Sequence, residues 1–277
     1  MGESAGLGAW FRVSEPEPGV FAIEEPLHAE RVVSYLIVGR ERSVLLDTGM
    51  GVAPLRPLVE SLTDKPLTVL LSHAHFDHIG GTHEFVGVSP ILIHELEAPK
   101  LRAGLGPSYL ARFYEPESLS GPLPAGFDPA VAAIPGAEPT DLLRGGETAD
   151  LGDRALEVLS CPGHAPGLVA VLDRQRRALY STDVAYAGAL YAHLPGVDLE
   201  AYQDTLAYLA RLAPDLDRLY PSHNQRPLPA DYLARMSRAV DAILAGRQAD
   251  ATQPDADVHL FDGFSVLVPP RPREVEA

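Results

Sequence analysis

The sequence contains a single cysteine, Cys161, so no disulfide bond can form within the chain. It also lacks any uninterrupted apolar run that approaches the roughly 18 residues of a membrane-spanning helix. The first 20 residues have neither the basic start nor the apolar stretch of a secretory signal peptide. These three absences lead us to expect a cytoplasmic protein that makes no contact with a membrane.

Basic residues are scarce as well. Lysine and arginine together number 22 against 38 aspartates and glutamates, which gives a formal net charge of −16. A nucleic-acid-binding protein needs basic surface to displace the counterions of the phosphate backbone, so this balance argues against DNA or RNA as a partner. A small-molecule substrate remains compatible with the charge, because a binding site can be locally positive. The oligomeric state stays open, with a homodimer as one option.

The pattern of apolar residues predicts an α/β protein. Runs of branched and aromatic residues predict strands over 19–23, 32–38, 43–47, 67–72, 90–94, 155–160, 168–172, 178–181, 218–220 and 259–268. Apolar residues spaced three and four apart predict helices over 52–62, 199–212 and 230–245, with a helical turn or two in 95–102. Several strands follow one another without a helix, so we expect mixed sheets covered by helices. The chain fits one domain, 1–277, whose two halves echo each other.

Residues 104–140 differ from the rest of the chain, because they are dense in glycine and proline with aromatic residues between them. We expect a long loop with one short helix near 108–114. Loops of this length in a compact domain are often functional, so we interpret 104–140 as a lid or insertion. Its apolar side chains either shelter part of a substrate or pack the short helix onto the domain; they are Tyr109, Leu110, Phe113 and Tyr114.

The strongest chemical signal is the segment His73-Ala-His75-Phe-Asp77-His78, which follows a predicted buried strand. His73 and His75 are two residues apart, so in an extended segment their side chains project to the same side. Three imidazoles and a carboxylate within such a short segment suit Zn²⁺, and also Fe or Mn. The alternative is a solvated polar turn in which Asp77 caps a helix. The density of donor atoms favours the metal site.

Four further motifs extend this signal along the chain. They are Leu45-Leu-Asp47-Thr-Gly49, Cys161-Pro-Gly-His164, Ser181-Thr-Asp183 and Pro221-Ser-His223. In this order, and each at a predicted strand end, they make the sequence resemble the metallo-β-lactamase-fold hydrolases from about 19 to 224. The resemblance implies a four-layer αββα sandwich of two mixed β-sheets covered by helices.

The resemblance also implies a site with two Zn²⁺ ions, or Fe or Mn in their place. His73, His75 and His164 would hold one metal, while Asp77, His78 and His223 would hold the second. Asp183 would bridge the two, and Asp47 would orient a ligand histidine. A shared hydroxide of lowered pKa would then attack a carbonyl or phosphoryl centre. Asp77 would orient this nucleophile and pass a proton to the leaving group.

The substrate is less strongly indicated. Tyr186 lies three residues after Asp183 and could donate a hydrogen bond to the developing oxyanion. The segments 183–195 and 19–24 resemble a branch that includes acyl-coenzyme A thioesterases. We therefore expect hydrolysis of an ester-like carbonyl: a thioester, a lactone or an activated ester. His193 could line the pocket.

Three other functions stay open. A β-lactamase is disfavoured because the chain has only two lysines, Lys65 and Lys100, and neither lies near a motif. A phosphodiesterase would use the same two-metal site. A non-enzymatic metal-binding module is disfavoured by the complete set of seven candidate ligands. Cys161 is expected to be a small buried residue and neither a nucleophile nor a ligand.

Overall fold

The first half of the chain builds a seven-stranded sheet whose strands follow their sequence order in a computed structural model that describes residues 10–270. The strands are β1 (Arg12–Glu17), β2 (Val20–Glu24), β3 (Val33–Val38), β4 (Ser43–Leu46), β5 (Leu67–Leu70), β6 (Ile91–His94) and β7 (Asp141–Leu143). The pairs from β1 to β4 are antiparallel, and those from β4 to β7 are parallel. The predicted mixed sheet is thus confirmed. β1 and β7 were not predicted, because β1 is polar and exposed and β7 is very short.

The second half builds a five-stranded sheet in the order β13-β11-β10-β9-β8. Its strands are β8 (Thr148–Asp150), β9 (Ala155–Ser160), β10 (Val169–Asp173), β11 (Ala178–Thr182) and β13 (Arg218–Pro221). All pairs are antiparallel except β11 with β13. A parallel pair needs a crossover connection, and this one includes helix α5 (Leu199–Leu212). The side chain of Asp198 caps α5 by accepting a 2.9 Å hydrogen bond from the amide of Ala201.

A third, four-stranded sheet was not predicted. It consists of β12 (Gly188–Tyr191), β16 (Phe264–Val268), β15 (Asp257–Phe261) and β14 (Ala251–Thr252), in that order. The single closing strand predicted over 259–268 was wrong, because the chain reverses within it. Gly263 has a φ of 81°, which allows a tight hairpin turn after Asp262 and pairs Phe261 with Phe264.

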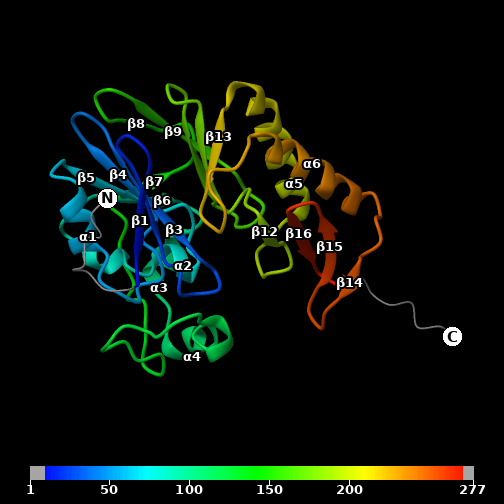
Figure 1. Ribbon diagram of the computed structural model, residues 1–277, viewed down its shortest axis with the longest axis horizontal. Coiled ribbons are helices and arrows are strands. Elements are labelled where there is room, and N and C mark those ends of the chain that lie inside the picture. Colours follow the sequence, from blue (N-terminus) through cyan, green and yellow to red (C-terminus); the bar gives the residue numbers. More distant parts are fainter. Residues whose placement is uncertain (1–9, 271–277) are drawn as a thin grey trace.

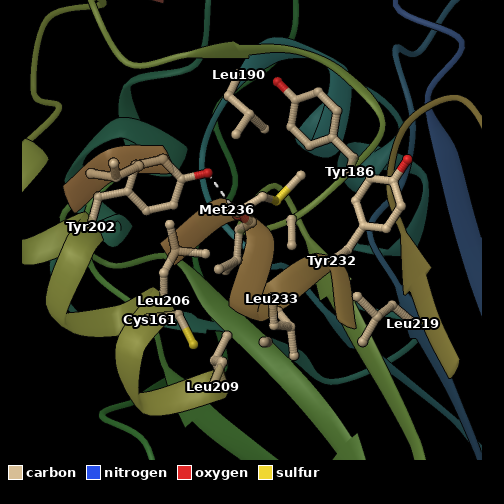
Figure 2. Packing of buried hydrophobic residues seen from close by; sticks show 14 of the residues in the cluster. Cys161, Tyr186, Leu190, Tyr202, Leu206, Leu209, Leu219, Tyr232, Leu233 and Met236 are labelled. Carbon is tan, nitrogen blue, oxygen red and sulfur yellow. Dashed lines mark hydrogen bonds between the residues drawn. The ribbon is translucent and has the colours of Figure 1, made fainter. Parts of the chain in front are cut away.

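Figure 1 shows the sheets and helices as layers, and three large apolar clusters lie between these layers. One lies between the two large sheets and joins residues such as Tyr35 of β3 to Val171 of β10. A second covers the outer face of the first sheet beneath the short helices α1 (Arg56–Leu62), α2 (Phe76–Ile79), α3 (Ala98–Ala103) and α4 (Pro107–Leu110). The third covers the outer face of the second sheet beneath α5 and α6 (Asp231–Leu244), as Figure 2 shows. The predicted four-layer αββα sandwich is therefore confirmed.

Helix α1 begins at Arg56, four residues later than predicted. The carboxylate of Glu84, in the 3₁₀ helix η1 (Thr82–Phe85), accepts 3.0 Å hydrogen bonds from the amides of Leu55 and Arg56 and so marks the helix start. Pro57 lies in the first turn, where its missing amide hydrogen costs no helical hydrogen bond. The proline therefore starts this helix and does not interrupt it. Helix α3 likewise begins later than predicted, at Ala98, within the helical stretch expected over 95–102.

The segment 104–140 is not one continuous loop. It contains α4, the 3₁₀ helices η2 (Ala111–Phe113) and η3 (Pro116–Ser118), and lies apart at the bottom of Figure 1. A fourth 3₁₀ helix, η4 (Ala213–Asp215), follows α5. Isolated bridges tie the segment to itself at Leu105 and Ile134, and to the body at His28 and Leu119. The short helix predicted near 108–114 is present, and the role of the segment as a lid stays a prediction.

None of the helices in the described part of the chain is long and apolar enough to cross a membrane. The stretch in which we expect no signal peptide lies partly outside the described residues, as do both ends of the expected single domain.

Candidate metal centre

The candidate residues come from strand ends that share one edge of the molecule. Asp47 directly follows β4, and the His73 segment follows β5, which is parallel to β4. In the second sheet β9 and β11 run in the same direction, because each is antiparallel to β10, and β13 is parallel to β11. The segments after them carry His164, Asp183 and His223. Because the carboxyl ends of these strands meet, all the predicted ligands come together.

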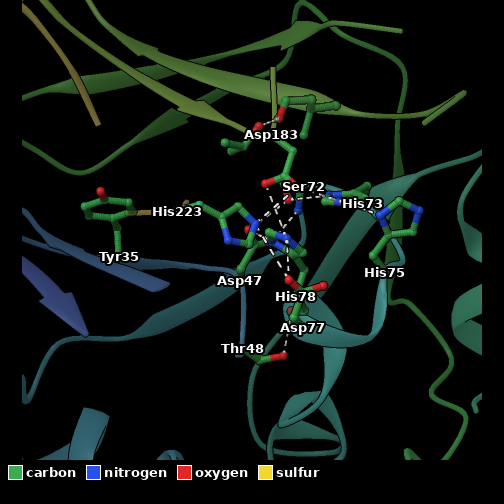
Figure 3. Close-up of polar contacts among 12 residues, drawn as sticks. Tyr35, Asp47, Thr48, Ser72, His73, His75, Asp77, His78, Asp183 and His223 are labelled. Carbon is green, nitrogen blue, oxygen red and sulfur yellow. Dashed lines mark hydrogen bonds and ion pairs between the residues drawn. The ribbon is translucent and has the colours of Figure 1, made fainter. Parts of the chain in front are cut away.

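The seven predicted metal ligands form three overlapping groups whose donor atoms lie within 4.8 Å of one another. The groups are His73, His75 and His164; His73, His78 and Asp183; and Asp77, His78 and His223. Figure 3 shows Asp183 approaching from the second sheet, opposite the His73 segment of the first. His75 is half-buried, and the other six residues are at most 5% exposed.

Three imidazole nitrogens converge in the first group. The Nδ1 atom of His75 lies 3.0 Å from Nε2 of His73 and 3.1 Å from Nε2 of His164. Ligands bound at about 2.0 Å in a tetrahedron lie roughly 3.3 Å apart, so this spacing suits one ion. Burial lowers the pKa of all three histidines, which keeps the rings neutral as metal ligands must be.

The four ligands outside the first group are two histidines and two carboxylates, which we call the second group: His78, His223, Asp77 and Asp183. Nε2 of His223 lies 3.6 Å from Oδ2 of Asp77 and 3.3 Å from Oδ2 of Asp183. Burial alone would lower the pKa of His223, but Asp183 and Asp77 raise it to about 9. Asp183 and Asp77 likewise raise the pKa of His78 against the effect of burial. The carboxylates therefore stabilise positive charge in this group, which protons or a metal cation can supply.

Two buried atoms in this group have no hydrogen-bond partner within residues 10–270. They are Nε2 of His78 and Oδ1 of Asp183, which lie 3.3 Å apart without hydrogen-bond geometry. A buried polar atom without a partner is costly, and such atoms in a native protein often mark an ion or water site. Both atoms face the cluster, so the residues present fit a metal ion.

Outer contacts fix which nitrogen of each ring is free. Asp47 accepts a 2.8 Å hydrogen bond from Nδ1 of His78, as predicted for a residue that orients a ligand histidine. It also accepts hydrogen bonds from the amide and the hydroxyl of Ser72, at 2.7 Å and 2.8 Å. The Ser72 oxygen then accepts from Nδ1 of His73 at 3.0 Å. In both histidines Nε2 is therefore the nitrogen that faces the cluster, where a metal would bind it.

Two contributors were missed in the sequence. Ser72 relays the Asp47 contact to His73, and its only signal was its place directly before a candidate ligand. Glu30 accepts a 2.8 Å hydrogen bond from Nδ1 of His223 through its backbone carbonyl. A contact through the backbone leaves no side-chain pattern, so this one had no signal to find.

The predicted oxyanion donor, Tyr186, lies beside the cluster. Its ring centroid is 5.1 Å from that of His223, and its hydroxyl donates a 2.6 Å hydrogen bond to the carbonyl of Ala189. The hydroxyl would have to exchange this acceptor for a substrate oxygen, so its role stays a prediction.

His193 lies farther along the same segment, with Nε2 3.8 Å from a carboxylate oxygen of Asp255. Cys161 is buried among apolar side chains (Figure 2), and burial raises the pKa of its thiol to about 12, as expected for an inert residue.

The 104–140 segment packs directly on the ligand loop. Phe113 stacks on Phe76, which lies between His75 and Asp77, with ring centroids 3.8 Å apart and planes at 18°. Nε2 of His28 donates a 2.7 Å hydrogen bond to the carbonyl of Phe113. Phe113 therefore contacts the ligand loop through its ring and His28 through its carbonyl.

Comparisons with known proteins bear on the family and the fold. The family model described as the metallo-beta-lactamase superfamily matches residues 29–223. The acyl-coenzyme A thioesterase MBLAC2 of Homo sapiens is 30% identical over 230 residues, which cover 77% of this chain and 81% of that protein.

Solved structures give the same picture. TTHA1623 in a di-iron-bound form is 29% identical with a TM-score of 0.57, over 76% of this chain and 95% of that chain. A metallo-beta-lactamase from Pontibacter korlensis has a TM-score of 0.62 at 18% identity, over 83% of this chain and 99% of that chain. The second likeness shows the fold alone.

Proposed function

Because the chain belongs to the metallo-beta-lactamase superfamily, we propose that it is a dinuclear metal-dependent hydrolase of ester-like carbonyls whose substrate is the thioester of an acyl-coenzyme A. The observation that carries the proposal is the position of Asp183 between two histidine groups. Its Oδ2 atom lies 3.5 Å from Nε2 of His164 and 3.3 Å from Nε2 of His223. The thioester is supported by the relative that is named as an acyl-coenzyme A thioesterase.

In this proposal His73, His75 and His164 hold one metal, and Asp77, His78 and His223 hold the other, with Asp183 shared. Nitrogen and carboxylate donors suit two Zn²⁺ ions, and Fe or Mn would also fit. When bound, the metals supply a nucleophilic hydroxide near neutral pH and polarise the carbonyl under attack.

The side chains around the metals direct the proton. Asp77 is 5% exposed, with Oδ2 3.7 Å from Nε2 of His78. Its carboxylate can accept the proton of the attacking water and deliver it to the sulfur that leaves as coenzyme A thiol. The hydroxyl of Tyr186 donates a hydrogen bond to the carbonyl oxygen of the substrate as negative charge develops there.

The insertion supplies the apolar surface for the acyl chain. Phe113 stacks on Phe76 beside the ligands. The ring centroids of Tyr109 and Phe113 are 5.5 Å apart, and Tyr109 is 40% exposed. An apolar and aromatic surface next to polar catalytic groups is typical of a site for a substrate with an acyl chain. A cytoplasmic location and a homodimer stay predictions beside this function.

The function is tested by comparing four substrates on one preparation: palmitoyl-coenzyme A, an acyl homoserine lactone, a cephalosporin and bis(p-nitrophenyl) phosphate. We expect kcat/KM for the thioester to exceed the others by at least about tenfold. Asp77→Asn should lose about 10²-fold or more in kcat. Asp64→Asn, at an exposed site, is the matched control.

Other outcomes would assign the site differently. A higher kcat/KM for the phosphate diester or the cephalosporin would contradict thioester hydrolysis. Absence of turnover with all four substrates, in protein loaded with metal, would favour a non-enzymatic module.

A further inference from the structure

Glu97 is a buried carboxylate that joins two of the ligand loops. It immediately precedes helix α3 and is 0% exposed. Its Oε2 atom accepts a 3.2 Å hydrogen bond from the amide of Ala74, and its Oε1 atom accepts a 3.1 Å hydrogen bond from the amide of Gly167. Each carboxylate oxygen therefore holds one loop.

The two loops carry all three histidines of the first group. Ala74 lies between His73 and His75 in the loop after β5, and Gly167 lies three residues after His164 in the loop after β9. The loops belong to different sheets, so their relative position is not set by strand pairing within either sheet. The Glu97 carboxylate spans this junction, together with a 3.0 Å hydrogen bond from the amide of Val169 to the carbonyl of Ser72.

Gly167 packs closely against the Glu97 side chain. A Cβ atom at Gly167 would lie 2.9 Å from Cγ of Glu97 and 2.8 Å from Nδ1 of His94, so only glycine allows this approach. The nearest cation is Lys100, whose Nζ lies 3.7 Å from Oε2. The buried carboxylate thus has two backbone donors and a charge partner.

We propose that Glu97 is a positioning residue that sets the distance between His164 and the His73–His75 pair, and thereby the affinity of the first metal site. The proposal rests on the metal centre of the proposed function. Residues that orient ligands from outside the coordination shell typically contribute about 10- to 100-fold to metal affinity. The hydrogen bonds and the ion pair of the Glu97 carboxylate are with Ala74, Gly167 and Lys100, so the second site, formed by Asp77, His78 and His223, should keep its affinity.

The test measures metal binding and not activity. Metal-free wild type, Glu97→Gln and Glu97→Ala are titrated with Zn²⁺ against a chromophoric chelator, which resolves the two dissociation constants. In Glu97→Ala we expect one dissociation constant to rise by about 10- to 100-fold and the other to stay unchanged. Glu97→Gln should be intermediate, because its amide oxygen can accept from one loop only.

Glu84→Ala is the matched control. Glu84 also accepts two backbone hydrogen bonds of 3.0 Å, but from Leu55 and Arg56 at the start of α1. It should lower stability without changing either dissociation constant. Two results would overturn the proposal. One is a folded Glu97→Ala variant that binds both metals with wild-type affinity. The other is a loss of affinity at both sites that is as large in Glu84→Ala as in Glu97→Ala. Binding of fewer than two metals by the wild type would instead contradict the dinuclear function.

Discussion

The carboxylate of Asp47 accepts a 2.8 Å hydrogen bond from Nδ1 of His78, and neither side chain is exposed. The same carboxylate accepts two hydrogen bonds from Ser72, whose oxygen accepts from His73. One aspartate therefore orients a histidine of each proposed metal group. Its backbone has a φ of 64°, a left-handed conformation that aspartate tolerates better than most residues.

Asp47→Asn should weaken both metal sites. The amide group offers one acceptor oxygen in place of two, and its NH₂ would face a donor. We expect each metal to bind about 10- to 100-fold more weakly, measured by chelator competition on the metal-free protein. Asp173→Asn is the control, because Asp173 is a buried aspartate away from the cluster that pairs with Arg154. Equal metal affinity in Asp47→Asn and the wild type would show that Asp47 does not support the site.

The metal-free protein should lose stability between pH 6.5 and about 9. In the folded state Asp183 and Asp77 raise the pKa of His223 from 6.5 to about 9, although burial alone would lower it. This raised pKa stabilises the folded state fully below pH 6.5, and the contribution disappears as the pH rises through about 9. The free energy of unfolding is measured by urea denaturation in the presence of chelator at several pH values. Between pH 6.5 and about 9 it should decline less steeply in His223→Gln than in the wild type.

His164→Gln is the control for the pH experiment. Burial lowers the pKa of His164, so its contribution to stability falls below pH 6.5 and not in the tested window. Its decline above pH 6.5 should match that of the wild type. An unchanged slope in His223→Gln would mean that folding does not raise the pKa of His223.

Tyr186→Phe separates a catalytic role from a structural one. Loss of an oxyanion donor should lower kcat for an acyl-coenzyme A by about 10²-fold or more with little change in KM. Tyr202→Phe is a matched control, because the Tyr202 hydroxyl also donates a 2.6 Å hydrogen bond to a carbonyl, that of Val184. If both variants lose stability alike and keep kcat, the Tyr186 hydroxyl serves only its bond to Ala189.

Phe113→Ala tests the insertion as the cover of an acyl chain. The variant removes the stack on Phe76 and shortens the apolar surface beside the ligands. We expect KM for palmitoyl-coenzyme A to rise about tenfold, while KM for acetyl-coenzyme A changes little, because only the long chain reaches the insertion. Val131→Ala, at a residue of the same insertion that is 69% exposed, should change neither. Equal increases for both substrates would argue against contact with the chain.

The sequence predicted those features that depend on local pattern. The apolar strands β3, β4, β5, β9, β10 and β11 and the helices α5 and α6 each bury one face or both, so their side chains show the expected periodicity. The structure also brings together the seven candidate ligands, because each lies in a segment that follows a strand and these strands run toward one edge.

Features set by long-range contacts were not predictable in this way. β12 is only four residues long and exists because it pairs with β16, more than 70 residues away. The start of α1 depends on the carboxylate of Glu84, which comes from a later segment. Glu97 joins loops from two sheets, and nothing near it in the sequence indicates either partner.

The most direct test of the account is a titration of metal-free protein with Zn²⁺ while palmitoyl-coenzyme A hydrolysis is followed. The proposed two-metal site predicts that turnover rises until two equivalents per chain are bound. It also predicts that variants of either group, His164→Ala or His223→Ala, bind one equivalent tightly and remain at least about 10²-fold less active. Full thioester hydrolysis at one equivalent, or in the metal-free protein, would contradict the central claim.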